Sequence, residues 1–178
     1  MTSLRLCLAG MAALLLSVTA TAQQPPAPPK PGPENELLKQ LVGTWDCTVK
    51  FGGMQSKGKA VYKEGPGGLW ILSDFTGEFG GAPFKGHGID GYDPAKKKYV
   101  GVWIDSMDTT PLVSEGAYDK GTKTLTMQGE AKGPDGKPAT HIMKTQWKDK
   151  DTLLFSMFMK GPDGKDQPVM TIDYKRTK

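Results

Sequence analysis

Between Trp45 and Arg176 the sequence alternates short stretches rich in Val, Ile, Thr, Tyr, Phe and Trp with residues that form tight turns. This alternation is typical of consecutive antiparallel strands, because strands joined by helical crossovers would be separated by longer amphipathic segments. The sequence therefore predicts an all-β fold of about ten strands. The predicted strands are 45–51, 56–64, 69–77, 84–93, 99–105, 112–119, 124–132, 140–148, 152–160 and 169–176.

Glycine recurs inside the predicted strands. Glycine within a strand costs stability unless the strand coils sharply or another backbone approaches closely, and closure of a sheet into a barrel demands such coiling. Closure also removes the unpaired edges of the sheet. We therefore expect a single antiparallel β-barrel rather than a two-layer sandwich, which the strand pattern also allows. The glycines are Gly86, Gly88, Gly91, Gly101, Gly116 and Gly129.

The N-terminal part of the chain divides into three segments. Residues 1–22 contain a basic residue, an apolar run and small residues at their end, which is the pattern of a cleavable secretory signal. Residues 23–33 are rich in proline and predict a disordered, extended leader. The barrel domain then spans 34–178. We expect an exported protein, located in the periplasm or outside the cell.

A short amphipathic helix is predicted immediately before the first strand. Leucine and valine recur at helical spacing between Glu34 and Val42, and Gly43-Thr44-Trp45 then begins the strand pattern. Because one side of the helix is apolar, we expect it to cover part of the barrel.

Composition excludes several classes of protein. Removal of the predicted signal leaves one cysteine, Cys47, so no disulfide within the chain is expected, and Cys47 is predicted to be a small buried apolar residue. The net charge is +4, and the only basic run, Lys96–Lys98, lies in a predicted turn, so we expect no binding to nucleic acid. No second apolar run is long enough to span a membrane.

Several motifs resemble one family. They are Leu37-Leu38-x-x-Leu41-Val42-Gly43-Thr44-Trp45, Gly86-x-Gly88-x-x-Gly91-Tyr92-Asp93, the segment 98–107, Ser114-Glu115-Gly116 and Gly161-Pro162-Asp163-Gly164-Lys165. Together they resemble the bacterial secreted proteins grouped as domain of unknown function 1579. The resemblance implies a calycin-like barrel, similar to lipocalins and fatty-acid-binding proteins, without an established activity. The more distantly similar nitrobindins bind haem through a late histidine, but no histidine follows His141 here, so no haem is expected.

Candidate ligand-binding residues come from the aromatic and polar positions of the predicted strands. Pockets for small molecules are mostly apolar, with a few placed polar groups. We predict an apolar wall and three candidate polar contacts, and we predict no catalytic residue, metal site or cofactor. The wall residues are Trp45, Trp70, Tyr99, Trp103 and Phe155, with a cluster of methionines near the C-terminus, and the polar contacts are His87, Asp105 and Glu115.

The orientation of these residues stays open at this stage. Tyr99, Trp103 and Asp105 share one face of their strand, but the opposite face is also apolar, so either could point inward. Glu115 either faces solvent or points into a cavity, where burial would raise its pKa. His87, between two glycines, is either an exposed strand residue or a ligand contact.

The function predicted from the sequence is binding of a small apolar or amphipathic molecule inside the barrel, without catalysis. One alternative is an isomerase or hydrolase in which Glu115 or Asp105 acts as a base beside His87, which requires these groups to converge. Another is a protein-interaction module of the cell envelope, which would carry an apolar patch on its outer surface. The sequence does not predict the ligand or the oligomeric state.

Overall fold

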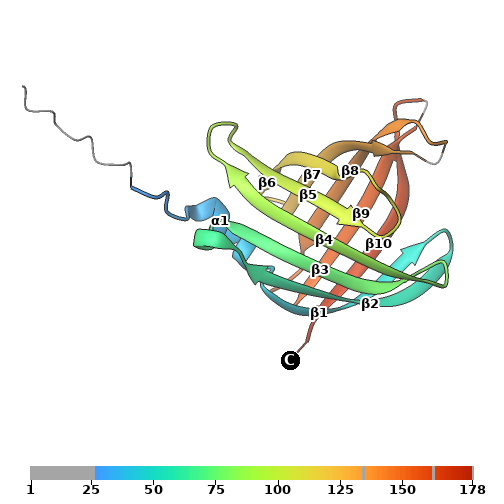
Figure 1. Cartoon of the computed structure of the whole chain (residues 1–178), viewed down its shortest axis with the longest axis horizontal. Helices are drawn as coiled ribbons and strands as arrows, with labels where there is room; N and C mark the ends of the chain where they lie inside the picture. The colour runs from blue at the N-terminus through green and yellow to red at the C-terminus, as the bar shows by residue number, and fades with distance from the viewer. Residues whose placement is uncertain (1–26, 134, 162, 178) are drawn as a thin grey trace, which may run out of the picture.

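The computed structural model describes residues 27–133, 135–161 and 163–177. In these residues ten antiparallel strands form a closed barrel, and a short helix lies at one end of it (Figure 1). The elements are α1 (Pro33–Lys39), β1 (Gly43–Phe51), β2 (Met54–Glu64), β3 (Trp70–Phe79), β4 (Ala82–Asp93), β5 (Lys98–Asp105), β6 (Leu112–Asp119), β7 (Thr124–Lys132), β8 (Pro138–Trp147), β9 (Thr152–Lys160) and β10 (Asp166–Arg176), with a single turn of 3-10 helix at Pro66–Gly68.

The strands form a simple meander in which each strand pairs with its neighbours in sequence. The barrel closes because β1 also pairs with β10, with Trp45 opposite Arg176 and Phe51 opposite Met170. The predicted all-β class, the number of strands and closure into a barrel are therefore confirmed. The predicted boundaries differ most at β10, which begins at Asp166 and contains an irregularity between Pro168 and Met170. Proline lacks the N–H that regular pairing needs, and the sequence pattern gave no sign of pairing beyond it.

The close contact between β6 and β7 shows why the strands need glycine. A Cβ atom added at Gly116 would lie 1.8 Å from the carbonyl oxygen of Thr126. Any other residue would force these two strands apart, so this glycine permits the curvature of the wall.

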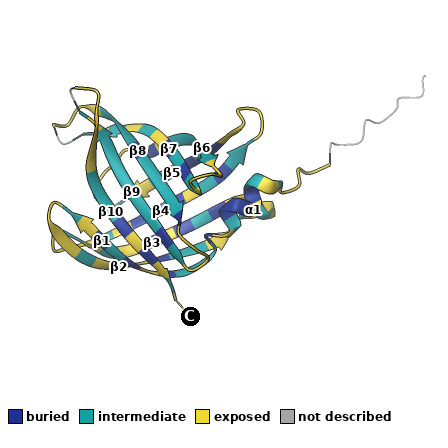
Figure 2. Ribbon diagram, turned by 180° about the vertical axis from the view of Figure 1, so that it is seen from behind, coloured by how far each residue is buried: buried dark blue, intermediate teal, exposed yellow. Residues whose placement is uncertain are grey.

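Helix α1 closes one end of the barrel. Its residues Leu37 and Leu38, together with Leu41 just after it, are buried against the barrel (Figure 2). The side chain of Asn35 donates a hydrogen bond to the carbonyl oxygen of Leu69 at 2.9 Å, which ties the helix to the connection between β2 and β3. The predicted helix therefore has the covering role that its apolar side indicated.

Trp45 and Arg176 complete the closed end. The indole N–H of Trp45 donates to the carbonyl oxygen of Leu41 at 2.8 Å. The Arg176 guanidinium lies over the Trp45 ring at 4.0 Å and donates hydrogen bonds to the carbonyl oxygens of Val42 and Gln40. These contacts join the first strand, the last strand and the segment after α1, so the closed end is held by both ends of the barrel domain.

The predicted signal segment, residues 1–22, and residues 23–26 of the predicted leader lie outside the described residues. No helix among residues 27–133, 135–161 and 163–177 has the length and apolar character needed to cross a membrane.

Candidate functional site

Alternation along each strand, combined with the register between strands, shows which residues face the interior of the barrel, called the lumen below. On β5, Tyr99 and Gly101 are buried, while Val102 and Ile104 are 40% and 52% exposed. Side chains at Tyr99, Trp103 and Asp105 therefore point into the lumen. The face that mixes aromatic and polar residues is the inner one.

Aromatic side chains gather at the open end of the lumen. The rings of Phe51 and Phe79 lie 4.5 Å apart, and Phe84 lies 5.9 Å from both Phe79 and Phe75. A hollow of about 230 Å³ lies between the tips of the β1–β2 and β3–β4 hairpins, lined in part by Phe51, Phe79 and Val49. The mouth of the barrel is therefore apolar and offers room for a small group.

Several inward-facing side chains deeper in the lumen remain partly accessible. In the strand register, Met143 on β8 lies opposite Met127 on β7 and Met157 on β9. Met143, Met157 and Phe155 are all only half-buried. By contrast, Cys47 on β1 is 1% exposed and fully packed. Inward positions in a solid core would all resemble Cys47, so the side of the lumen formed by β8 and β9 is incompletely filled.

The lumen also contains a carboxylate, that of Asp90 on β4. In the register, Asp90 lies opposite Ile71 on β3 and Gly101 on β5, both of which are buried. Its carboxylate occupies the space that a side chain at Gly101 would need, because a Cβ atom there would lie 2.5 Å from Oδ1 of Asp90 and 3.4 Å from Oγ of Ser114. Three adjacent strands thus bring a carboxylate and a hydroxyl together inside the barrel.

The surroundings of Asp90 disfavour its charged form. Burial raises the pKa of this carboxyl group from 3.8 to about 7. Burial likewise raises the pKa of Tyr62 on β2 and of Tyr174 on β10, and the charge of Asp90 adds to the rise of both. Among the described residues no hydrogen-bond donor satisfies the Asp90 carboxylate.

The other inward-facing polar side chains described below lie away from Asp90. Arg176 is held at the closed end by backbone carbonyl groups. Asp105 lies toward the mouth, where it accepts hydrogen bonds from the indole N–H of Trp103 at 2.9 Å and from the backbone N–H of Met107 at 2.8 Å. His141 on β8 faces the lumen, and its Nε2 atom is buried without a hydrogen-bond partner in the described part of the chain.

The predicted wall residues divide between the lumen and the closed end. Trp103 and Phe155 face the lumen and are half-buried. Trp45 is fully buried at the closed end, and Tyr99 packs there against Tyr92 with ring centroids 5.2 Å apart. These last two residues belong to the base of the barrel rather than to the space above it.

Three predicted site residues lie on the outer surface. Trp70 is 39% exposed and covers Gly91 from outside. The Nδ1 atom of His87 lies 2.8 Å from Oδ1 of Asp74 on the outer face of β3 and β4. Trp70 and His87 therefore do not line the lumen.

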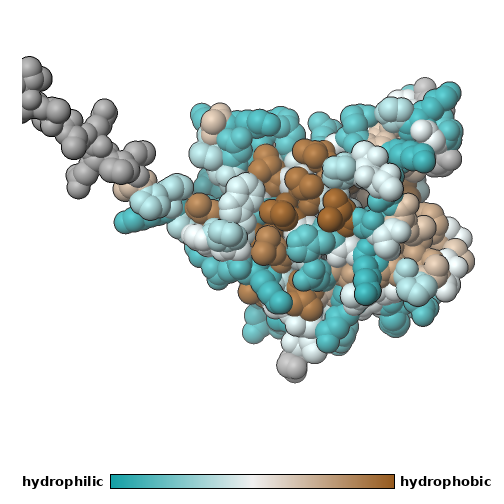
Figure 3. Space-filling model, in the orientation of Figure 1, coloured by the Kyte–Doolittle hydropathy of each residue, from teal (hydrophilic) through white to brown (hydrophobic). Residues whose placement is uncertain are grey.

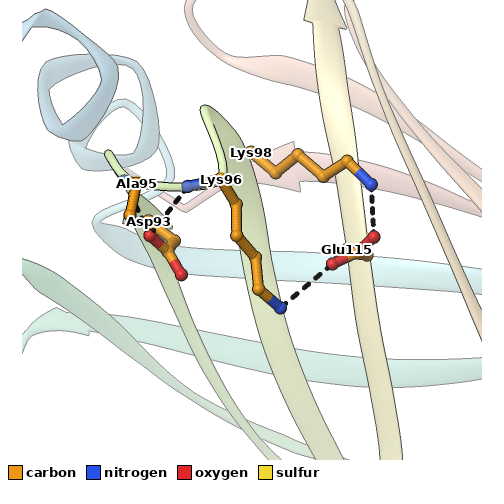
Figure 4. A network of polar contacts seen from close by, with 5 residues as sticks. All are labelled: Asp93, Ala95, Lys96, Lys98 and Glu115. Atoms are coloured by element: carbon orange, nitrogen blue, oxygen red, sulfur yellow. Dashed lines mark hydrogen bonds and ion pairs between the residues drawn. The ribbon is translucent and has the colours of Figure 1, made fainter.

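Glu115 also points outward, between two lysines (Figure 4). Its carboxylate contacts Lys98 and lies 3.2 Å from the ammonium group of Lys96. The hydrogen bond from Lys98, followed by that from Lys96, lowers the pKa of Glu115. The structure therefore separates Glu115 and His87, which are outside, from Asp105, which is inside.

Asp90 is the inward carboxylate that sequence reasoning missed. The strand alternation could have shown its orientation, because Asp90 lies on the same face of β4 as Gly86 and Gly88, and both glycines are buried on the inner face. A carboxylate on the face of a strand that carries glycines, where larger side chains from neighbouring strands fit, could have been identified as a lumen residue.

The outer face of β3 to β6 carries an apolar strip. Ile89, Val102 and Val113 lie side by side in the register, and their exposures are 38%, 40% and 61%. In Figure 3 a cluster of hydrophobic side chains covers this part of the surface. Contiguous apolar patches of this kind mark interaction sites more often than isolated apolar residues do.

The fold defines a helix-capped, closed antiparallel barrel. A family profile described as "Protein of unknown function (DUF1579)" matches residues 30–176, so the chain belongs to this family. A comparison with curated proteins found no match.

Two solved structures show the same fold at low sequence identity. The crystal structure of Rv2717c from M. tuberculosis has a TM-score of 0.57 and 13% identity, with 83% of this chain and 99% of that one covered. The S-type phycobiliprotein lyase CPES from Guillardia theta has a TM-score of 0.56 and 12% identity, with 81% and 92% covered. At these identities the likeness concerns the fold alone.

Proposed function

We propose that this protein binds a small apolar or amphipathic molecule in the lumen of its barrel. The observation that carries the proposal is the partial accessibility of inward-facing Phe155, Met143 and Met157, together with an inward-facing carboxylate, Asp90 on the opposite side of the barrel, that accepts no hydrogen bond from a described residue. A packed core would bury Phe155 and the two methionines completely, and it would exclude a carboxylate without a hydrogen-bond partner. An apolar lumen with one placed polar group is the usual composition of a small-molecule site.

The expected affinity is moderate. Burial of roughly 200 Å² of apolar ligand surface would contribute about 5 kcal/mol before the costs of association are subtracted. Methionine side chains adapt to irregular apolar shapes, so the β8–β9 side of the lumen can accommodate apolar ligands of different shapes.

We also propose that the barrel works after export, because residues 1–22 have the composition of a secretory signal. A periplasmic or extracellular location can be checked by fractionation of the natural host, together with the N-terminal sequence of the mature protein. Cleavage near residue 22 supports export, and an intact N-terminus in the cytoplasmic fraction contradicts it.

Two tryptophan variants test lumen binding. Trp103 points inward, with its ring lying across Gly86, whereas Trp70 points outward over Gly91. Titration with the neutral fluorescent probe N-phenyl-1-naphthylamine should show weaker binding to Trp103→Ala by about tenfold, since an apolar contact worth about 1.4 kcal/mol is lost. Trp70→Ala is the matched control and should bind as the wild type does. Equal loss in both variants, or no binding to the wild type, would contradict the proposal.

The enzymatic alternative receives no support from the positions of its residues. It requires Glu115 or Asp105 to act beside His87, but Glu115 is paired with lysines outside, His87 with Asp74 outside, and Asp105 lies inside. Asp105 and His87 lie on opposite faces of the wall. Glu115 and His87 share the outer face but are each paired with other residues, so neither pair makes the contact that general acid–base catalysis needs.

Association of the outer apolar strip is a second candidate function, favoured by the exposed row of Ile89, Val102 and Val113. We name a second copy of this chain as the occupant, because a two-fold contact would bury the same apolar strip of both copies against each other.

Sedimentation of wild type and Val113→Glu tests this second function. A dimer that the variant abolishes would support it. A monomeric wild type at about 100 µM would contradict it, since obligate dimers are tighter than this.

A further inference from the structure

We propose that Asp90 selects the polar end of the ligand: the lumen accepts amphiphiles whose head group donates hydrogen bonds, preferably an amine, and rejects amphiphiles that end in a carboxylate. This inference rests on the proposed lumen function and adds the class of ligand. It starts from an inward carboxylate whose lone pairs no described residue satisfies.

The residues around Asp90 leave its carboxylate free to accept a hydrogen bond from a ligand. Gly101 leaves the space that Oδ1 of Asp90 occupies, and Oγ of Ser114 borders the same space. On the other side, a Cβ atom at Gly88 would lie 2.5 Å from Oγ of Ser73, so a second hydroxyl lies beside the strand that carries Asp90. A head group that reaches Oδ1 of Asp90 meets a carboxyl acceptor and the hydroxyl of Ser114, which can donate or accept.

The electrostatics of the lumen oppose an anionic head group. The inward-facing cation Arg176 is committed to the carbonyl groups of Val42 and Gln40 at the closed end, so it does not neutralise a charge beside Asp90. Above pH 7, where Asp90 is mostly ionised, a carboxylate head would lose its hydration and face the like charge of Asp90. An ammonium head would instead form a charge-assisted hydrogen bond, which is stronger than a neutral one.

The titratable groups that face Asp90 do not alter this preference. They are Tyr62 on β2 and Tyr174 on β10, with Cys47 on β1 acting on both phenols, and burial raises the pKa of each of them, so all three are neutral near pH 7. The raised pKa of Asp90 itself means that an ammonium ligand, which favours the ionised carboxylate, should lower that pKa on binding.

The test compares three ligands with the same ten-carbon chain: decylamine, 1-decanol and decanoate. Each competes with N-phenyl-1-naphthylamine for the full-length mature protein at pH 7.5, with wild type, Asp90→Asn and the control Asp74→Asn, which removes a carboxylate from the outer face. In the wild type and in Asp74→Asn, decylamine should bind about tenfold more tightly than decanoate, as expected for one charge-assisted hydrogen bond. In Asp90→Asn this difference should fall to less than about threefold.

Each outcome is decisive. Equal or tighter binding of decanoate by the wild type overturns the inference, and so does a head-group preference that survives in Asp90→Asn. If Asp90→Asn does not fold, the order of the three ligands on the wild type still decides. If neither the naphthylamine probe nor any of the three ligands binds, the proposed lumen function itself is contradicted. If they bind without the expected head-group preference, only the inference about Asp90 fails.

Discussion

The carboxylate of Asp90 lies where a side chain at residue 101 would lie, since a Cβ atom at Gly101 would be 2.5 Å from its Oδ1 atom. Gly101 and Asp90 are direct partners in the register of β4 and β5. The interior position of the carboxylate therefore depends on a glycine in the neighbouring strand, and this pairing makes the first prediction possible.

Gly101→Ala should push the Asp90 carboxylate out of its place. Part of the cost falls on a side chain that can rotate, so we expect a loss of about 1–3 kcal/mol in the free energy of unfolding, measured by urea denaturation. The pKa of Asp90, followed by NMR of its carboxyl carbon, should also change. An alanine variant with unchanged stability and unchanged pKa at Asp90 would contradict the described position of the carboxylate.

Asp90 also makes stability depend on pH. Its pKa is about 7 in the folded protein, above the ordinary value of 3.8, so the folded state binds the proton more tightly than the unfolded state does. Its favourable effect is present in full below about pH 4 and is lost as the pH rises through 7. The loss is on the order of a few kcal/mol at most, at about 1.4 kcal/mol for each unit of pKa.

The comparison that isolates this effect uses Asp90→Asn, whose side chain cannot ionise. The stability of the wild type relative to this variant should fall between pH 5 and pH 8 when both are unfolded in urea. Parallel pH profiles for the two proteins would show that Asp90 is ionised freely in the folded state.

Removal of Arg176 should loosen the closed end. Arg176→Ala loses hydrogen bonds to Val42 and Gln40 and the stacking contact on Trp45, so we expect a loss of about 2–4 kcal/mol in the free energy of unfolding. Hydrogen exchange should accelerate in α1. Lys175→Ala, on the exposed neighbouring residue, is the control and should change little.

Glu115 should matter little despite its two lysine partners. The carboxylate and both ammonium groups are largely exposed, so the contacts with Lys96 and Lys98 are screened by water and salt. Glu115→Gln should change the free energy of unfolding by less than about 1 kcal/mol and should leave naphthylamine binding unchanged. A large loss of binding would place Glu115 in the site, contrary to its outward position.

Cys47 should be unreactive in the folded protein. It is 1% exposed, and burial raises its pKa to about 12, so the reactive thiolate is scarcely present at neutral pH. A disulfide reagent such as 5,5′-dithiobis(2-nitrobenzoate) should react only after urea is added. Rapid reaction without denaturant would indicate that β1 opens readily.

The features predicted correctly from the sequence depend on local signals. Turn residues and alternation mark each strand, and glycines within strands indicate strong coiling, so the strands, the closed barrel and the covering helix could all be inferred. The structure places Trp103 and Phe155 on the inner faces of their strands, and their contact with a ligand stays a prediction.

The features missed depend on orientation across the whole barrel. Both faces of β5 are apolar, because the outer face carries exposed apolar residues such as Val102. Alternation along the strand therefore could not show which face points inward. His87 and Glu115 have exposed partners, Asp74 and Lys98, on other strands. These partners are distant in sequence and become neighbours only when the strands pair. Asp90 was passed over because an acidic residue is usually exposed.

The most direct test of the account is the location of a bound ligand in solution. We predict that decylamine bound to methyl-labelled protein gives intermolecular nuclear Overhauser effects to the methyl groups of Met143 and Met157, which face the lumen. Contacts confined to the methyl groups of Val102 and Val113, on the outer strip, would contradict the claim that the lumen is the binding site.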